Sequence, residues 1–410
     1  MGLARVTSQA RPYRSPRVLV ALGNLNLNGQ ERGNIEVYRA LQADGVEARF
    51  ATHAEWGHRH LQPYLDRLEL AWSPVPYARH FTKQLGIKGG LRNLRHVRAA
   101  SQAFRQLGQE VQPTHVHLAN PHYALNVLPA LRAIGASVIY RMGDAPTLHH
   151  AVYRTLWTHG ILPRVDRFVC NSEYVRRTAL ASGVPEEKTA VILSTPPRRT
   201  TITSSDLPDD LAAERAGEAN AFAGRTVVYM GQFSAHKGVD RLVEAAIQLC
   251  RQRDDVRFLI AGAPPGRSPF AADLVQRVLM AGLGERIRFL GYIEDIPGLL
   301  ELADIHTVPS VWEEPLANTA LEAKRAGVPS VLFPSGGLPE LVLNPGRDAT
   351  LCTDKTPDAL ATGLQHYLDL DDEALAAASA AARNSLEPLG CDETTFRSQW
   401  LQVLMETMPS

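Results

Sequence analysis

Short apolar runs alternate with longer amphipathic stretches along most of the 410-residue chain. Apolar runs of about four to eight residues between turn signals are typical of buried strands, and periodic stretches of about ten or more are typical of helices. In the first half, the pattern predicts strands at residues 18–22, 46–51, 115–118, 137–141, 167–170 and 190–193. Strands that alternate with helices predict a mostly parallel sheet covered by helices.

A second run of alternating strands and helices begins at Thr226. The preceding stretch, residues 198–224, is rich in small and acidic residues, which is typical of a linker or of an irregular first segment of a domain. A chain of this length is too long for one ordinary core. We therefore predict two Rossmann-like domains, residues 1–197 and 198–390, and an amphipathic helix within 391–410 that packs back toward the first domain.

The stretch from His306 to Val342 carries the strongest functional signal in the chain. It predicts a buried strand, then a loop that contains Glu314, then a helix over residues 319–326. In open α/β sheets, ligands bind at the carboxyl ends of strands, and the N-terminus of a helix attracts anions. This order of elements therefore predicts a ligand site.

Two glutamates of this stretch, Glu314 and Glu322, lie eight residues apart and can face one cleft. Each also has an ordinary structural interpretation. Glu322 fits a capping box with Thr319, in which the glutamate accepts a hydrogen bond from a backbone N–H group. Glu314 can be a solvated carboxylate in a loop. The residues alone leave both alternatives open.

Two further loops follow predicted strands. Gly29 lies in a loop that lacks the G-x-G-x-x-G dinucleotide fingerprint, so this glycine either turns the chain or lets the backbone approach a ligand. Lys237 lies between a strand and a helix, without the glycine spacing of a P-loop. A cation is unfavourable at a helix N-terminus. We therefore expect Lys237 to contact a phosphate group.

The overall composition excludes several classes of protein. With 43 basic and 43 acidic residues, the net charge is zero, which argues against nucleic acid as the main partner. The four cysteines form no C-x-x-C pair, so neither a disulfide framework nor a zinc site is predicted. We find no secretory signal and no apolar stretch of about 18 residues, the length of a membrane span. We expect a cytoplasmic protein whose membrane contact would be peripheral.

One segment, residues 79–105, is strongly basic, and no acidic residue occurs between Glu69 and Glu110. The basic residues are Arg79, Lys83, Lys88, Arg92, Arg95, Arg98 and Arg105. Part of this stripe falls on a predicted helix over residues 91–107. The stripe is either a solvated helix face or a dock for anionic lipid or for a phosphorylated acceptor.

Histidines and a carboxylate mark loops of the first half. His115 and His117 lie on one face of a predicted strand, and His122 follows in the next loop. A metal site needs a third ligand at a fixed geometry, which the sequence does not identify. The alternatives are packed histidines or hydrogen-bonding groups in a polar pocket. Asp144, after the strand at 137–141, is either a helix cap or a carboxylate that binds an acceptor.

The second half contains a set of motifs in a fixed order. They are Gly231…Lys237-Gly238, Gly291, Pro309-Ser310…Glu314-x7-Glu322-Ala, Ala326-Gly327-Val-Pro329 and Gly336-Gly337-Leu-Pro339-Glu340. This set closely resembles the retaining GT-B glycosyltransferases of family 4. The first half is similar to the family more loosely, through Gly29-Gln-Glu-Arg and Asn171-Ser172.

The resemblance implies an α/β protein with the GT-B fold, in which two Rossmann-like domains enclose a deep cleft. The first domain would bind an acceptor and the second a nucleotide-sugar. The implied activity is transfer of a sugar with retention at the anomeric carbon, without a metal or another cofactor. Such a protein would act in the synthesis of a glycan, glycolipid or polysaccharide.

The resemblance also implies roles for single residues. As the catalytic residues, Glu314 would lie against the donor sugar and Lys237 would contact the diphosphate, while Glu322 would bind the ribose hydroxyls. The predicted donor-binding residues are Gly29, Gln232, Lys237, Tyr292, Ile293, Ala317, Asn318, Thr319 and Glu322. The predicted acceptor residues are His122 and Asp144.

Three departures from the family pattern affect what the resemblance implies. Gln232 stands where many members have arginine, so the diphosphate site has one charge fewer. Leu316-Ala317 replaces Phe-Gly, and alanine permits a less close backbone approach than glycine. A histidine often found at a strand end of the first domain is replaced within residues 141–144. Alternatives to a transferase are a non-catalytic nucleotide-sugar-binding partner and a GT-B sugar-nucleotide epimerase.

Overall fold

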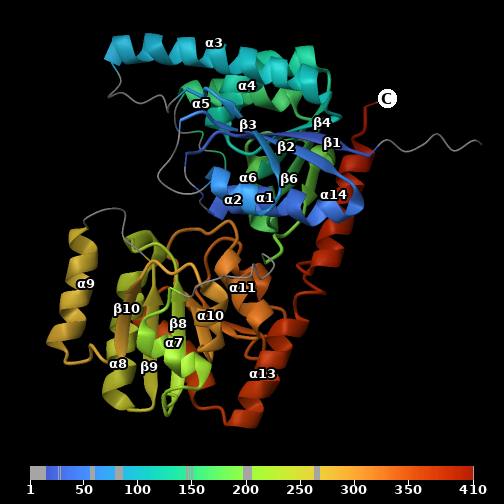
Figure 1. Ribbon diagram of the computed structural model, residues 1–410. Helices are drawn as coiled ribbons and strands as arrows, with labels where there is room; N and C mark the ends of the chain where they lie inside the picture. Colours follow the sequence, from blue (N-terminus) through green and yellow to red (C-terminus); the bar gives the residue numbers. More distant parts are fainter. Residues whose placement is uncertain are drawn as a thin grey trace, which may run out of the picture.

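The computed structural model describes residues 15–25, 27, 29–55, 61–78, 86–144, 146, 148, 151–196, 206–262 and 268–409. The side chains of residues 86–91 and 151–152 fall outside this description. The chain forms two lobes, one above the other in Figure 1, and each lobe is built on one parallel sheet. The predicted α/β class is therefore confirmed.

The N-terminal lobe contains a seven-stranded sheet in the order β3-β2-β1-β4-β5-β6-β7. Its strands are β1 (Arg17–Leu22), β2 (Glu47–His53), β3 (Ala71–Val75), β4 (His115–Leu118), β5 (Ser137–Met142), β6 (Arg167–Cys170) and β7 (Thr189–Val191). Its helices are α1 (Gly29–Leu41), α2 (Leu61–Arg67), α3 (Gly86–Val111), α4 (Pro121–Ile134), α5 (Ala151–Thr155) and α6 (Glu173–Ala181). Val18 pairs in parallel with Ala48 of β2 and with His115 of β4.

The strand order of this sheet reverses between β1 and β4. In open α/β sheets, the loops at the carboxyl ends of the strands form the ligand crevice at such a reversal. The start of α1 follows β1, and the start of α4 follows β4. These two loops therefore occupy the position where a ligand of the N-terminal lobe is expected.

The six strands predicted for the first half are confirmed, with ends that differ by one or two residues. The hydrophobic pattern misses β3, because Ser73 and Pro74 interrupt its apolar run. Proline lacks the N–H group that a central strand needs, but β3 lies at the edge of the sheet, where the loss is tolerated.

The C-terminal lobe contains a six-stranded parallel sheet in the order β10-β9-β8-β11-β12-β13. Its strands are β8 (Arg225–Met230), β9 (Val256–Ala261), β10 (Ile287–Gly291), β11 (Ile305–Val308), β12 (Ser330–Leu332) and β13 (Ala349–Leu351). Its helices are α7 (Asp209–Ala216), α8 (Val239–Gln252), α9 (Pro269–Met280), α10 (Ile296–Glu301), α11 (Asn318–Ala326), α12 (Pro357–Leu368) and α13 (Asp372–Asn384). Here the strand order reverses between β8 and β11.

The stretch at residues 198–224 is not irregular throughout, because it contains α7. Leu211 of this helix is fully buried in an apolar cluster with Val228 and Leu259 of the C-terminal sheet. The expectation of a linker is therefore wrong for α7, which packs onto the second lobe. Residues 197–205 lie outside the described part of the chain.

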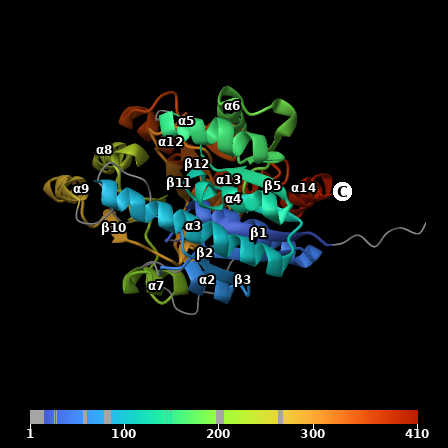
Figure 2. The same ribbon diagram turned by 90° about the horizontal axis from the view of Figure 1, so that it is seen from above.

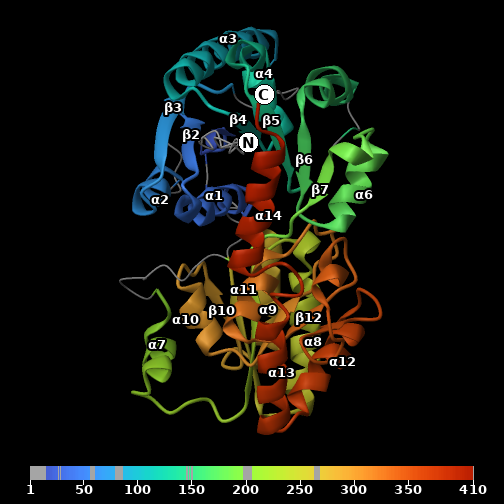
Figure 3. The ribbon, with the colours of Figure 1, turned by 90° about the vertical axis from the view of Figure 1, so that its right-hand side faces the viewer.

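The last helix, α14 (Glu393–Glu406), runs from the C-terminal lobe to the N-terminal lobe (Figure 3). Phe396 and Trp400 share an apolar cluster with residues of the first lobe. The Trp400 ring stacks on His117, with 5.9 Å between the ring centroids. Arg397 donates two hydrogen bonds, of 2.9 and 2.7 Å, to the carboxylate of Asp44. The end of the chain therefore packs as part of the first lobe.

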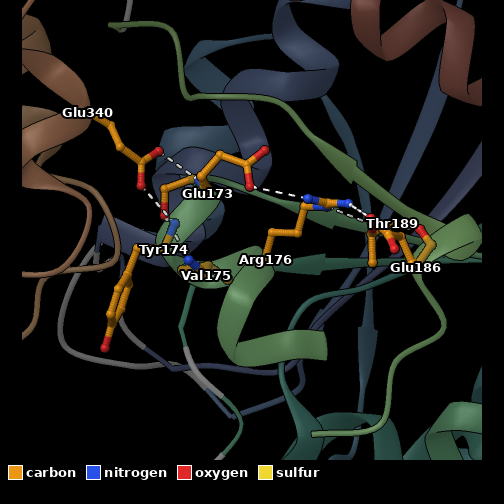
Figure 4. Close-up of polar contacts among 8 residues, drawn as sticks. Glu173, Tyr174, Val175, Arg176, Glu186, Thr189 and Glu340 are labelled. Carbon is orange, nitrogen blue, oxygen red and sulfur yellow. Dashed lines mark hydrogen bonds and ion pairs between the residues drawn. The ribbon is translucent and has the colours of Figure 1, made fainter. Parts of the chain in front are cut away.

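A second connection between the lobes involves the motif Gly336-Gly337-Leu-Pro339-Glu340. The Glu340 carboxylate accepts hydrogen bonds of 2.7 Å from the backbone N–H groups of Glu173 and Tyr174, at the start of α6 (Figure 4). The hydroxyl of Ser172 accepts a third, from Val175. A carboxylate is favourable at a helix N-terminus, so Glu340 holds α6 against the C-terminal lobe.

Helices α3 and α4 lie on the side of the first lobe that faces away from the second (Figures 1 and 2). The helix α3 is longer at both ends than the predicted 91–107. Arg92, Arg95 and Arg98 are exposed on it, and Leu94 between them is 54% exposed. The remaining basic residues of this stripe before Arg92 lie outside the described side chains.

Candidate functional site

Lys237 and Glu314 form an ion pair where the strand order of the C-terminal sheet reverses. Lys237 ends a short 3₁₀ turn (Ala235–Lys237) after β8, and Gly238 follows it with a positive φ of 65°. A side chain at Gly238 would collide with the carbonyl of Pro309. This glycine therefore allows the loop after β8 to pack on the loop after β11, which brings the two charges together.

Glu314 is held from several sides and is only 6% exposed. The Ser310 hydroxyl donates a 2.7 Å hydrogen bond to the same carboxylate oxygen that pairs with Lys237. The backbone carbonyl of Glu314 accepts a 2.7 Å hydrogen bond from Gly337. A side chain at Gly336 would collide with the backbone of Glu314. The interpretation of Glu314 as a solvated loop carboxylate is therefore wrong.

The helix α11 begins at Asn318, with Ala317 as its N-cap. Thr319 lies inside the helix and cannot be the cap, so the capping box proposed for Thr319 and Glu322 is wrong. Within the described residues, no side chain caps this helix. Its N-terminus can therefore receive an anion from a ligand.

Glu322 lies four residues further along α11 and is half-buried. Burial raises the pKa of its carboxyl to about 7; Arg32 and Arg325 oppose the rise, and Glu36 adds to it. Arg32 and Glu36 belong to α1 of the other lobe. The electrostatic environment of Glu322 is therefore set by both lobes. A carboxyl with a raised pKa near a helix N-terminus is typical of a functional position.

Gly29, the first residue of α1, faces Asn318, the first residue of α11. A methyl group on Gly29 would lie 4.0 Å from Nδ2 of Asn318. The N-termini of two helices from different lobes therefore meet. Backbone N–H groups and helix dipoles at such a place favour a polyanion such as a diphosphate.

Asp144 comes from the N-terminal lobe, directly after β5. By surface area the residue is exposed. Partial burial of its carboxyl and the charge of Glu314 raise the pKa of Asp144 to about 6, and the charge of Lys237 lowers it. The three charges therefore lie close enough to interact across the lobes.

Asp144 and His122 line the same cavity of about 220 Å³. The other residues described around it are Gln30, Ala119, Asn120, Pro121, Tyr140, Met142, Gly143, Pro146, Tyr153 and Trp157. Tyr153 Oη lies 2.7 Å from His122 Nδ1, and Gln30 donates a 2.7 Å hydrogen bond to the carbonyl of Ala119. The sequence contains no signal for Tyr153, because only the fold brings α5 to the loop after β4.

Three of the predicted donor-binding residues lie at the same edge of the C-terminal sheet, after β8 and β10. Gln232 and Tyr292 are exposed, and Ile293 is buried in the apolar cluster of Leu299. Their role stays a prediction.

His115 and His117 are packed histidines. His117 is fully buried between Tyr38 Oη, at 2.6 Å from Nδ1, and Asn34 Oδ1, at 3.1 Å from Nε2. Burial and the charge of Arg141 lower its pKa to about 3, so the ring is neutral. No cluster of three His, Cys, Asp or Glu suited to a metal ion occurs among the described residues. Nor is any described helix long and apolar enough to cross a bilayer.

Two family models match the chain. Residues 224–369 match the model described as glycosyl transferases group 1, and residues 27–193 match that of glycosyltransferase family 4. The chain belongs to the family 4 glycosyltransferases. The resemblance deduced from the motifs is therefore confirmed. The second match covers the first half, where the sequence motifs are sparse.

Characterised relatives are distant from this glycosyltransferase. The 2-deoxystreptamine glucosyltransferase of Streptomyces kanamyceticus is 30% identical over 268 residues, which are 58% of this chain and 65% of that protein. The lipopolysaccharide core biosynthesis mannosyltransferase LpsB of Rhizobium meliloti is 30% identical over 198 residues, 48% of this chain and 53% of that protein. The chain thus aligns with less than two thirds of the length of these relatives.

Solved structures share the fold along nearly the whole chain. The crystal structure of HepE from Anabaena, in complex with UDP and glucose, gives a TM-score of 0.73 at 20% identity and covers 95% of this chain and 99% of that one. Sucrose-phosphate synthase from Thermosynechococcus elongatus gives 0.73 at 18% identity, with 96% and 99% covered. These likenesses confirm the predicted GT-B fold of the glycosyltransferase.

Proposed function

We propose that this protein transfers a sugar from a nucleotide-sugar to an acceptor, with retention at the anomeric carbon. The observation that carries the proposal is the meeting of the two lobes at one set of charges. Asp144 of the N-terminal lobe lies close enough to Lys237 and Glu314 of the C-terminal lobe for their charges to change its pKa. A donor on one lobe and an acceptor on the other would react at this point.

The donor would bind to the C-terminal lobe. Its diphosphate would lie between Lys237 and the uncapped N-terminus of α11, which together offer a cation and backbone N–H groups. Glu322 would accept hydrogen bonds from the ribose hydroxyls, as acidic residues do in dinucleotide sites. HepE, a structural neighbour, was crystallised with UDP-glucose, and we propose a UDP-sugar as the first donor to test.

Glu314 would lie against the donor sugar, and Lys237 would stabilise the leaving diphosphate. In a front-face mechanism, the acceptor hydroxyl forms the new bond to the anomeric carbon while the bond from that carbon to the phosphate oxygen breaks. The acceptor proton passes to this phosphate oxygen. Because Lys237 and the amides of α11 can neutralise the leaving group, we propose that transfer needs no divalent ion.

The acceptor would bind in the cavity that contains His122 and Asp144. This cavity supports a transferase over the epimerase alternative, since an epimerase needs no acceptor pocket. The non-catalytic alternative requires nucleotide-sugar binding without turnover. The test is release of UDP from UDP-glucose with and without 2-deoxystreptamine or other sugar-like acceptors, in the presence of EDTA. Release of UDP that depends on the acceptor supports a transferase. Release without an acceptor supports the epimerase or a hydrolase. Binding of UDP-glucose without release of UDP supports the non-catalytic partner.

We also propose that α3 binds the surface of anionic membranes. Arg92, Arg95 and Arg98 are exposed on this helix with Leu94, and the helix lies on the side of the first lobe away from the second. A basic helix face with an exposed apolar residue is typical of helices at membrane surfaces.

Vesicle sedimentation tests this membrane contact. Binding should require anionic lipid and weaken as salt rises, because exposed charges are screened. Replacement of all three arginines by glutamine should abolish it, whereas Arg132→Gln on α4 serves as a matched control. Equal binding to neutral vesicles at any salt concentration would refute the proposal.

A further inference from the structure

The cavity that Asp144 and His122 line has a size that restricts its occupant. Pockets for drug-sized ligands usually measure about 300–1,000 Å³. This cavity measures about 220 Å³ and is therefore suited to one sugar or cyclitol ring rather than to several. It lies at the carboxyl ends of β4 and β5, with Gln30 of α1 on its border.

The polar walls of the cavity are fixed before any ligand binds. Asn120 accepts a 2.9 Å hydrogen bond from the backbone of His122, and Gln30 is bonded to Ala119. The rings of His122 and Tyr153 meet edge to face, with 4.7 Å between their centroids. A ring with several hydroxyl groups would find hydrogen-bonding partners here beside an aromatic surface, at a low cost in ordering side chains.

The charged groups at the cavity carry more negative than positive charge. Among the described residues that line it, Asp144 is the only carboxylate, and none is a lysine or an arginine. The nearby Glu314 adds a second negative charge, and Lys237, which lowers the pKa of Asp144, is paired with Glu314. Arg141 precedes Asp144 by three residues, but its guanidinium donates to Ser194 and Asn34 and does not line the cavity.

The carboxylates of Asp144 and Glu314 and the ammonium group of Lys237 together carry one net negative charge. A bound nucleotide diphosphate adds further negative charge. A phosphate or carboxylate on the acceptor would therefore be repelled, and an ammonium group would be attracted.

We propose that the acceptor is an amino sugar or an aminocyclitol, with its ammonium group paired to the carboxylate of Asp144. This inference rests on the proposed function and names its acceptor class. The amine would orient the ring and take no part in bond formation. A neighbouring hydroxyl would attack the anomeric carbon and pass its proton to the departing phosphate oxygen.

Calorimetry with three rings of similar size tests the proposal. The full chain, saturated with UDP, is titrated with 2-deoxystreptamine, which carries two amines, with neutral myo-inositol, and with the anion inositol 3-phosphate. We expect 2-deoxystreptamine to bind up to about fivefold more tightly than myo-inositol, because a partly solvated ion pair contributes up to about 1 kcal/mol. We expect inositol 3-phosphate to bind most weakly.

The variant Asp144→Asn tests whether this residue causes the preference for 2-deoxystreptamine over myo-inositol. The variant should bind 2-deoxystreptamine and myo-inositol about equally, although the diphosphate of bound UDP is still present. Tyr153→Phe, in the same cavity, should weaken both ligands and keep the preference for the amine. A preference that survives in Asp144→Asn, tighter binding of the phosphate, or no binding of any ring to the UDP complex would overturn the inference. Failure to bind UDP itself would instead contradict the proposed function.

Discussion

Replacement of Glu322 by glutamine should flatten the pH dependence of nucleotide-sugar binding. Burial raises the pKa of Glu322 to about 7. If the ribose hydroxyls bind the ionised carboxyl, about nine tenths of the protein is competent at pH 8 and about one tenth at pH 6. The affinity of the unmodified protein for UDP-glucose should therefore fall about tenfold as the pH falls from 8 to 6.

Other groups near the site must be separated from Glu322. The pKa of Glu322 is raised by burial and by the charge of Glu36, and it is lowered by Arg32 and Arg325. Asp144, with a pKa of about 6, gains negative charge as the pH rises and should oppose diphosphate binding. Asp144→Asn should therefore steepen the pH dependence, and Glu322→Gln should remove or invert it. UDP-glucose is the suitable ligand because its diphosphate has no proton to lose in this range.

Stability provides an independent readout of the same residue. The folded-state pKa of Glu322 is raised above the ordinary value of a glutamate carboxyl. The folded state therefore binds this proton more tightly than the unfolded state, and its contribution to stability is lost as the pH rises from about 5 to about 7. Glu322→Gln should raise the melting temperature at pH 8 more than at pH 5. A variant with an unchanged pH profile of binding and of melting would refute the assigned environment of Glu322.

Three further predictions concern other parts of the molecule. Lys237→Ala should lower the rate of sugar transfer by about 10²-fold or more, because the leaving diphosphate loses its cation, and turnover equal to that of the unmodified protein would refute the role. Trp400→Ala should lower the free energy of unfolding by about 3–5 kcal/mol in urea titrations, because its side chain is fully buried, whereas the exposed Gln402→Ala should have little effect. Glu340→Ala should lower the melting temperature and increase the radius of gyration in X-ray scattering, because α6 loses two hydrogen bonds to the other lobe; equal behaviour of the exposed control Glu387→Ala would contradict this.

The fold and half of the site follow from local patterns. Apolar runs such as that of β11 are buried strands, and Lys237 and Glu314 mark two loops that the strand order brings together. The capping interpretation of Glu322 fails because the helix begins one residue earlier than the pattern predicts. A helix boundary depends on tertiary contacts as well as on capping residues.

The remaining part of the site depends on contacts between distant segments. Tyr153 reaches His122 across 31 residues, and Asp144 meets the charges of Lys237 and Glu314 only because the lobes pack together. Periodicity carries no information about such pairs. The family resemblance indicated Glu340 as part of a motif, but its role at the start of α6 appears only in the fold.

The most direct test of the central claim is equilibrium binding of UDP-, GDP-, ADP- and TDP-sugars to the purified chain and to Glu322→Ala. The account predicts that one nucleotide-sugar binds with a 1:1 stoichiometry and that its affinity falls about tenfold or more in the variant, as the loss of a charged hydrogen-bond acceptor implies. Binding of no nucleotide-sugar, or equal affinity of both proteins for the one that binds, would contradict the assignment of the site between the lobes.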